Sequence, residues 1–174
     1  MTYDTNTDRI RLTHGYRPGV IADIVGAHIV YYAPTWGFGL AFETKVAAEL
    51  SAFLQRYDPA RDLLVCATDA SGAFLGSITI DGTHGHADAG AHLRWFITTD
   101  AARGSGLGRQ LLTAAVDFCD AQGYATTYLT TFAGLDAARH LYERFGFRLH
   151  SETDADTWSG GSVGEQRFVR MRPA

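Results

Sequence analysis

The segment R-G-S-G-L-G at residues 103–108 constrains this chain more than any other part of its sequence. It lies between an apolar run, residues 93–97, and an amphipathic stretch, residues 106–122. Glycines let a backbone approach a ligand without interference from Cβ atoms. A helix that begins there turns unpaired N–H groups and its positive dipole end toward the loop. The pattern therefore predicts a strand, a pyrophosphate-binding loop and a helix, in that order.

The spacing of this loop disfavours two nucleotide-binding motifs. A G-x-G-x-x-G fingerprint beginning at Gly104 requires glycine at position 109, which is arginine. A P-loop requires a lysine after its last glycine, and Lys45 is the single lysine of the chain. The loop instead resembles the R/Q-x-x-G-x-G/A signature of the GCN5-related N-acetyltransferases, with Arg103, Gly106 and Gly108 at the three signature positions. Taken alone, it is also compatible with an ordinary strand-to-helix turn.

A second segment carries the same resemblance. Residues 135–147 place apolar side chains at helical spacing, and Gly146 then ends the helix before an extended run. The segment resembles the A-x-x-L-Y-x-x-x-G-F element that ends the acetyltransferase core, here residues 138–147. The resemblance implies that Tyr142 protonates the departing coenzyme A thiolate. The alternative is that Tyr142 is a core aromatic residue, the commoner fate of tyrosine on an apolar helical face.

The rest of the pattern predicts one α/β (α+β) domain. Two helices are expected between the first two strands, with a helix start at Pro18 and a break at Pro34, Gly37 and Gly39. Strands are expected at residues 9–14, 63–68, 74–80, 91–98, 124–130, 147–153 and 166–171, and later helices at 106–122 and 135–145. This order resembles the acetyltransferase fold, which implies a central mixed, mostly antiparallel sheet whose fourth and fifth strands splay apart.

Composition limits the remaining function classes. With 174 residues and 46% hydrophobic content we expect one domain over residues 1–174, with 1–8 as a frayed start. A net charge of −4 without a basic stripe disfavours a nucleic-acid partner. No secretory leader is evident, and no run approaches the roughly 18 apolar residues of a membrane span. Cys66 and Cys119 are expected to be small buried side chains. We therefore expect a cytoplasmic monomer or homodimer with no membrane partner.

A closer resemblance is to acetyltransferase domains that are often fused behind a MarR-type DNA-binding domain. It is carried by residues 17–19, 31–32, 36–37, 42–43, 93–94 and 131–147. The chain has no room for a helix-turn-helix domain ahead of its first predicted strand. We therefore do not expect DNA binding.

The family resemblance implies an acetyl-coenzyme A-dependent N-acetyltransferase. A primary amine, chiefly that of a small molecule, would attack the acetyl thioester directly in a ternary complex. The backbone of Phe96, Ile97 and Thr98 would pair with the pantetheine arm, and N–H groups at the splay would stabilise the oxyanion. The loop would hold the pyrophosphate through Arg103, Gly104, Ser105, Gly106, Leu107, Gly108 and Arg109.

Two residues compete for the role of general base. His92 lies on the predicted fourth strand, where relatives such as the arylalkylamine acetyltransferases use a histidine, and imidazole titrates near neutral pH. Glu43 lies on the predicted second helix, where acceptor-side residues lie in this fold. Their alternative roles are an ordinary strand histidine and a solvated helical charge. Either residue could act through water, or the reaction could need no dedicated base.

Two further clusters invite a functional interpretation. Residues 81–88 hold two histidines and two carboxylates but match no closed zinc pattern, so we expect no metal site. Aromatic residues could line an apolar pocket for the acceptor, namely Tyr31, Tyr32, Trp36, Phe38, Trp95 and Trp158.

Alternatives to a small-molecule N-acetyltransferase stay open. The amine could belong to a protein lysine or N-terminus. The chain could instead be a non-catalytic acyl-coenzyme A-binding module, which a functional Tyr142 and base would argue against. A nucleotide-dependent enzyme of doubly wound type is disfavoured by the failed fingerprints.

Overall fold

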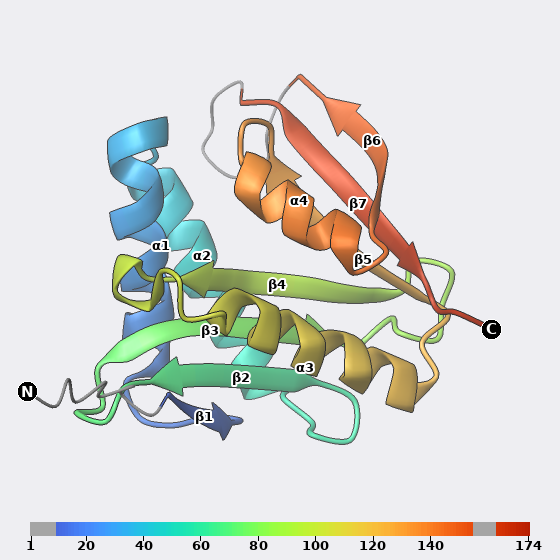
Figure 1. Cartoon of the computed structure of the whole chain (residues 1–174), viewed down its shortest axis with the longest axis horizontal. Helices are drawn as coiled ribbons and strands as arrows, with labels where there is room; N and C mark the ends of the chain where they lie inside the picture. Colours follow the sequence, from blue (N-terminus) through green and yellow to red (C-terminus); the bar gives the residue numbers. More distant parts are fainter. Residues whose placement is uncertain (1–9, 155–162) are drawn as a thin grey trace, which may run out of the picture.

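The computed structural model describes residues 10–154 and 163–174 (Figure 1). The predicted frayed start, residues 1–8, and Trp158 lie outside these ranges. In chain order the elements are β1 (Arg11–His14), α1 (Val20–Trp36), α2 (Leu40–Gln55), β2 (Leu63–Thr68), β3 (Phe74–Asp81), β4 (Ala91–Thr98), the 3₁₀ turn η1 (Asp100–Ala102), α3 (Leu107–Gln122), β5 (Thr126–Phe132), α4 (Asp136–Arg144), β6 (Arg148–Thr153) and β7 (Glu165–Met171).

The seven strands form one mixed sheet in the order β1-β2-β3-β4-β5-β7-β6. Neighbouring strands run antiparallel except β4 and β5, which are parallel. In the described residues β4 and β5 pair at two positions only, Ala91 with Thr127 and His92 with Tyr128. The rest of β4 is therefore not paired with β5, and the predicted mixed sheet with a splay between its fourth and fifth strands is confirmed.

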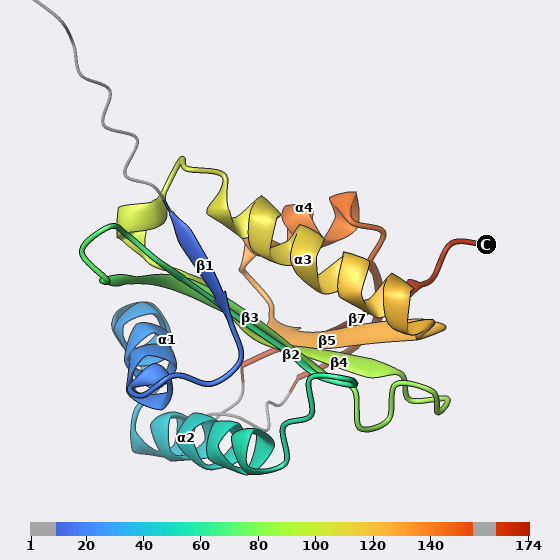
Figure 2. The same cartoon turned by 90° about the horizontal axis from the view of Figure 1, so that it is seen from below.

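Helices cover both faces of the sheet (Figure 2). α1 and α2 lie on one face, and α3 and α4 lie on the other. Strand β2 contributes to both cores because alternate side chains point to opposite faces: Leu64 and Cys66 belong to one cluster, and Leu63 and Val65 to the other. Both cysteines are buried and free, as predicted.

Most predicted boundaries shift by one or two residues; α1 begins at Val20 and not at Pro18, because Gly19 before it is left-handed with a φ of 88°. Two further differences have a clear physical cause. Helix α1 continues through Pro34 and ends at Gly37, whose φ of 68° is left-handed and whose N–H donates to the carbonyl of Ala33 at 3.0 Å. Proline removes only one backbone donor, so this last turn survives. Strand β5 begins at Thr126 because the N–H of Tyr124 donates to the carbonyl of Cys119 and so completes the end of α3.

Strand β4 contains a bulge at its centre. Ser77 pairs with Ile97 and Thr79 with Arg94, so Ile78 alone faces both Trp95 and Phe96. Trp95 has a φ of 46°, a strained value for an aromatic residue. The hydroxyl of Ser77 donates to the carbonyl of Trp95 at 2.8 Å and holds this conformation. Bulges of this kind redirect backbone and side chains next to functional sites.

Candidate active site

The glycine-rich loop leads into the N-terminus of α3. Gly104 and Gly106 have φ values of 77° and 76°, so both occupy the left-handed region. A Cβ atom on either would meet no protein atom within 4 Å, so the space in front of the loop is open. Gly106 precedes the helix without a side-chain cap, and its helix presents N–H groups at that end.

The charged residues of the loop lie at the surface. The guanidinium of Arg103 pairs with Asp100 at 2.7 Å, and its side chain is 82% exposed. Arg109 is also exposed. Ser105 tightens the turn, because its hydroxyl donates to the carbonyl of Ala102 at 2.6 Å and accepts from the N–H of Leu107 at 3.3 Å. The loop thus combines open backbone with two exposed cations.

A cleft runs from the β4 splay to α4, and we call it the splay cleft. Its cavity volume is about 240 Å³, and it is partly open to solvent. Residues Phe96, Ile97 and Thr98 form its β4 side, and Gly108 lies at the helix α3 side. A Cβ on Gly108 would lie 3.5 Å from Leu141, in ordinary contact. The full wall comprises residues 31–32, 96–98, 108, 131, 135, 137–138 and 141–142.

A second pocket lies between the sheet and the pair α1 and α2, and we call it the central pocket. Its cavity volume is about 70 Å³. Side chains from five elements line it: His28, Tyr32, Phe42, Val46, Tyr142 and residues 92–96 and 129–132. The bulged residues Trp95 and Phe96 are part of this wall. The pocket is largely apolar and aromatic.

The two cavities share part of their walls. Tyr32, Phe96, Thr131 and Tyr142 line both of them. The two cavities therefore adjoin at these four residues. This junction lies where β4 bulges and parts from β5.

Tyr142 is buried at this junction. Its side chain is 6% exposed, and its ring packs against Phe96, Phe147 and Phe168 at centroid distances of 5.9, 6.1 and 6.1 Å. Burial raises the pKa of its phenol, with smaller contributions from the nearby tyrosines Tyr32 and Tyr31. The hydroxyl therefore keeps its proton at neutral pH. Both sequence interpretations apply to this residue, since it lies in the core and also lines the cavities.

His92 lines the central pocket from β4. Its half-buried ring stacks on Tyr128 of β5 at a centroid distance of 4.3 Å. Burial lowers the pKa of His92 to about 4, and Asp81 opposes that shift while Arg167 adds to it. The imidazole is therefore neutral at pH 7 and able to accept a proton.

Glu43 lies apart from these cavities. It is exposed in the first turn of α2 and lines neither the central pocket nor the splay cleft. On the same helix Phe42 and Val46, its neighbours on the buried face, do line the central pocket. The structure thus brings His92 and Tyr142 to one pocket and does not bring Glu43 there.

Two wall residues of the central pocket were not singled out as site residues in the sequence. His28 is buried in α1, its Nδ1 lies 2.7 Å from the carbonyl of Ile24, and burial lowers its pKa to about 4. Arg94 pairs with Glu49 of α2, and its guanidinium lies 4.2 Å from the ring centroid of Trp95. The sequence signal that could have found both is a polar residue at a helix or strand position where the pattern expects an apolar one.

Only some of the aromatic residues predicted to line an acceptor pocket do line the central pocket or the splay cleft. Tyr32 and Trp95 line the central pocket, and Tyr31 lines the splay cleft. Phe38 packs in the core against Phe42 and Phe132 instead. Trp36 joins the same aromatic cluster through Phe38 at 6.3 Å.

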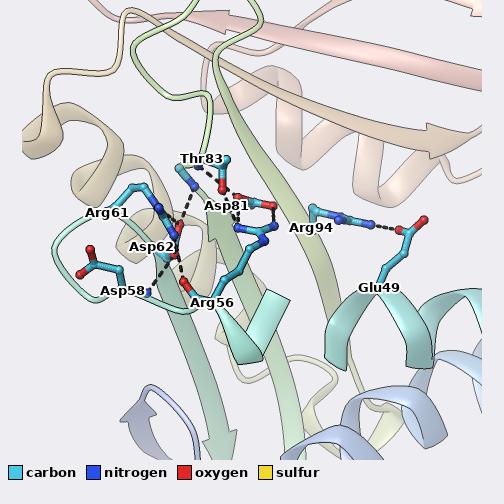
Figure 3. A network of polar contacts seen from close by, with 9 residues as sticks. Glu49, Arg56, Asp58, Arg61, Asp62, Asp81, Thr83 and Arg94 are labelled. Atoms are coloured by element: carbon cyan, nitrogen blue, oxygen red, sulfur yellow. Dashed lines mark hydrogen bonds and ion pairs between the residues drawn. The ribbon is translucent and has the colours of Figure 1, made fainter. Parts of the chain in front are cut away.

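The turn after β3 is built from structural contacts. Asp81 accepts from Arg56 at 3.0 Å, and buried Asp62 accepts from the N–H of Gly82 at 2.9 Å and from Arg61 (Figure 3). The hydrogen bonds from Arg56 help keep the pKa of Asp81 below its ordinary value against desolvation. Across residues 10–154 and 163–174 no three metal-ligating side chains gather at one place.

Comparison with known proteins agrees with this geometry. The model of the acetyltransferase (GNAT) family matches residues 28–147, more than half of the chain. An uncharacterized N-acetyltransferase from Schizosaccharomyces pombe is 27% identical over 118 residues, which is 67% of this chain and 70% of the relative.

Solved structures show the same fold. A GNAT-family acetyltransferase from Staphylococcus aureus superposes with a TM-score of 0.76 at 15% identity, covering 95% of this chain and all of the other. One from Streptococcus pneumoniae gives 0.69 at 17% identity, with 95% and 100% covered. In the part of the chain that is described, no helix is long and apolar enough to cross a membrane. By its family match, its fold and its relatives, this chain belongs to the GNAT family of acetyltransferases.

Proposed function

We propose that this protein transfers an acetyl group from acetyl-coenzyme A to a primary amine of a small molecule, by direct attack in a ternary complex. The observation that carries the proposal is the junction of the two cavities at Tyr142. The splay cleft takes the coenzyme and the central pocket takes the amine. Acetyl-coenzyme A supplies the activated acetyl thioester.

The residues present fit the coenzyme. The open space before Gly104 and Gly106 lies at the N-terminus of α3 and suits a pyrophosphate, which the exposed guanidiniums of Arg103 and Arg109 would attract. The backbone of residues 96–98 lies beyond the last β4–β5 pair and would hydrogen-bond the pantetheine arm. Ser105 and Leu107 complete the loop that shapes this site.

The reaction requires four features: a binding site for the thioester, a hydrogen-bond donor to the oxyanion, a general base and a general acid. Backbone N–H groups at the β4 bulge are the proposed oxyanion donors, because the bulge disrupts their ladder with β3. The protonated hydroxyl of Tyr142 would donate its proton to the departing thiolate sulfur. His92 would accept the proton of the attacking ammonium, directly or through water.

No covalent acetyl-enzyme is needed. Cys66 and Cys119 are buried, burial raises the pKa of each thiol to about 11, and neither lines the central pocket or the splay cleft. These thiols are protonated at neutral pH and are poor nucleophiles. This supports direct attack by the amine.

The finer relationship to domains fused to MarR-type regulators is also a proposal. It rests on the sequence resemblance alone, carried by residues 17–19, 31–32, 36–37, 42–43, 93–94 and 131–147. The cytoplasmic location and the monomeric or dimeric state are proposed on composition alone.

Two measurements test the function. Calorimetric titration should give tighter binding of acetyl-coenzyme A than of ATP or NAD; equal affinities would contradict the coenzyme assignment. A screen of amines, including lysine peptides, with thiol release as the readout should give turnover with small amines. Tight binding without thiol release would favour a non-catalytic acyl-coenzyme A-binding module, and turnover of peptides alone would favour a protein acetyltransferase.

A further inference from the structure

The described wall of the central pocket carries one charge at neutral pH. His28 and His92 are neutral because burial lowers their pKa values to about 4. Burial also keeps Tyr32 and Tyr142 protonated by raising their pKa values. Arg94 stays cationic, since burial lowers its pKa only to about 10. A bound acceptor therefore meets a cation on this wall and no carboxylate.

Arg94 is fixed in place and incompletely hydrogen-bonded. Its side chain is 12% exposed, pairs through Nη2 with Glu49 of α2 (Figure 3) and stacks on Trp95. Its Nε is buried without a hydrogen-bond partner. A buried N–H of a charged group without an acceptor is unfavourable. Nε itself is closed off from the pocket, so a ligand oxygen would provide that acceptor only if the guanidinium shifts toward the pocket that Arg94 lines.

Glu49 does not offer the acceptor an anionic contact within the pocket. Its carboxylate lies outside the wall and is shared between two cations, because Oε1 accepts from the ammonium of Lys45 at 2.5 Å and Oε2 accepts from Arg94. A polyamine in the central pocket would therefore meet the like charge of Arg94 and no carboxylate of the wall. The electrostatics of this wall favour an anionic group on the acceptor.

We propose that Arg94 binds a carboxylate on the acceptor, so that the preferred substrates are amines that also carry a carboxylate, such as amino acids. This inference rests on the proposed function. Arg94 and His92 lie two positions apart in the regular part of β4, on one face and about 7 Å apart along the strand. That spacing suits a small molecule whose carboxylate and ammonium face different side chains. The aromatic and aliphatic walls would hold the rest of the acceptor.

Matched pairs of acceptors test the proposal. Thiol release is measured for phenylalanine against 2-phenylethylamine, leucine against isoamylamine, and glycine against methylamine, with spermidine as a polycation. Phenylalanine methyl ester keeps the skeleton and has a less basic amine, so basicity alone would favour the ester. We expect kcat/KM to favour the acid of at least one pair by roughly 10- to 100-fold, mainly through KM. Equal or lower kcat/KM for the acid in every pair would overturn the proposal.

Variants assign the preference to Arg94. Arg94→Met should bring the acid-to-amine ratio of kcat/KM near one and leave the affinity for acetyl-coenzyme A unchanged. Lys45→Met is the matched control, because Lys45 is the other cation paired with Glu49 and does not line the pocket. This variant should keep the preference for acids. A preference that survives Arg94→Met would overturn the assignment. If Arg94→Met does not fold, Arg94→Lys, which keeps the charge but loses the planar fork, should still lower the ratio at least several-fold.

A binding measurement separates this inference from the proposed function. Calorimetry with the same acids in the presence of coenzyme A needs no catalysis. Acids that bind through Arg94 without any thiol release would contradict the proposed acetyl transfer and support the carboxylate site. Thiol release without an acid preference would support the transfer and overturn the carboxylate site.

Discussion

The glycine-rich loop and the central pocket are the two halves of the candidate site, and they are built in opposite ways. The loop is seven consecutive residues, 103–109, whose open backbone faces solvent at one helix end. The central pocket takes side chains from five elements, namely α1, α2, β4, β5 and α4. A local backbone device suits a constant ligand group such as a pyrophosphate. A pocket of assembled side chains allows the acceptor to vary while the loop stays the same.

The junction at Tyr142 gives the largest expected effect. Tyr142→Phe keeps the ring that packs on Phe96 and deletes one hydroxyl. Turnover should fall by about 10²–10⁴ while acetyl-coenzyme A affinity stays the same, because only proton donation is lost. Steady-state kinetics and calorimetry measure the two quantities. Turnover within a few-fold of the parent would mean that the thiolate leaves without help from this phenol.

The two histidines of the central pocket should make the free energy of unfolding depend on pH, whereas the glycine-rich loop holds no such group. Native His28 and His92 bind protons only below about pH 4, whereas unfolded histidine does so below about 6.5. Unfolding therefore takes up protons between these values, so the free energy of unfolding should fall as pH drops through that window. Each histidine contributes at most about 3 kcal/mol, and half-buried His92 contributes less.

Denaturant titrations from pH 7.5 to 5 measure this slope above the range where carboxylates titrate. His28→Gln should flatten the slope. His84→Gln, at an exposed site, is the matched control and should leave it unchanged. A slope that is equal in both variants and the parent would show that His28 does not titrate with a lowered pKa.

In the loop, a side chain should block the coenzyme. Gly106→Val places a branched side chain in the open space where the pyrophosphate is proposed to lie, and it also strains a residue with a φ of 76°. Acetyl-coenzyme A affinity should fall by about 10- to 100-fold. Gly108→Ala is the control, because its Cβ fits at 3.5 Å from Leu141 and alanine satisfies the family signature. An unchanged affinity in folded Gly106→Val would rule out this loop as the pyrophosphate site.

The smallest effect concerns His92 as the base. With a pKa of about 4, its deprotonation should make log kcat/KM rise near pH 4 and contribute no inflection between pH 6 and 8. His92→Ala should remove the acidic inflection, and Glu43→Gln at the exposed helix start should not. Because the amine's own ionisation also raises the rate with pH, two acceptors of different basicity are compared. An inflection that follows the acceptor and survives both substitutions would exclude either residue as an essential base.

The same contrast explains what the sequence predicts. The strand, loop and helix order around residues 103–109 and the bounds of β2 are predicted correctly, because the glycine spacing and the turns that flank β2 are local signals. The helix break predicted at Pro34 is wrong, because the loss of one backbone donor does not end α1, which continues to its C-cap at Gly37. The acceptor half depends on non-local packing. Glu43 and Glu49 lie on one helix, and only the docking of α2 on β4 brings Glu49 to Arg94 and leaves Glu43 exposed.

The central claim is that the coenzyme and the amine occupy adjoining cavities at the same time. Initial-rate kinetics with acetyl-coenzyme A and the best acceptor of the amine screen test it most directly. If both cavities are filled before transfer, double-reciprocal plots of rate against one substrate at several concentrations of the other should intersect. No burst of thiol release should occur without the amine. Parallel lines, or stoichiometric thiol release without an amine, would indicate an acetyl-enzyme intermediate and contradict direct transfer across the Tyr142 junction.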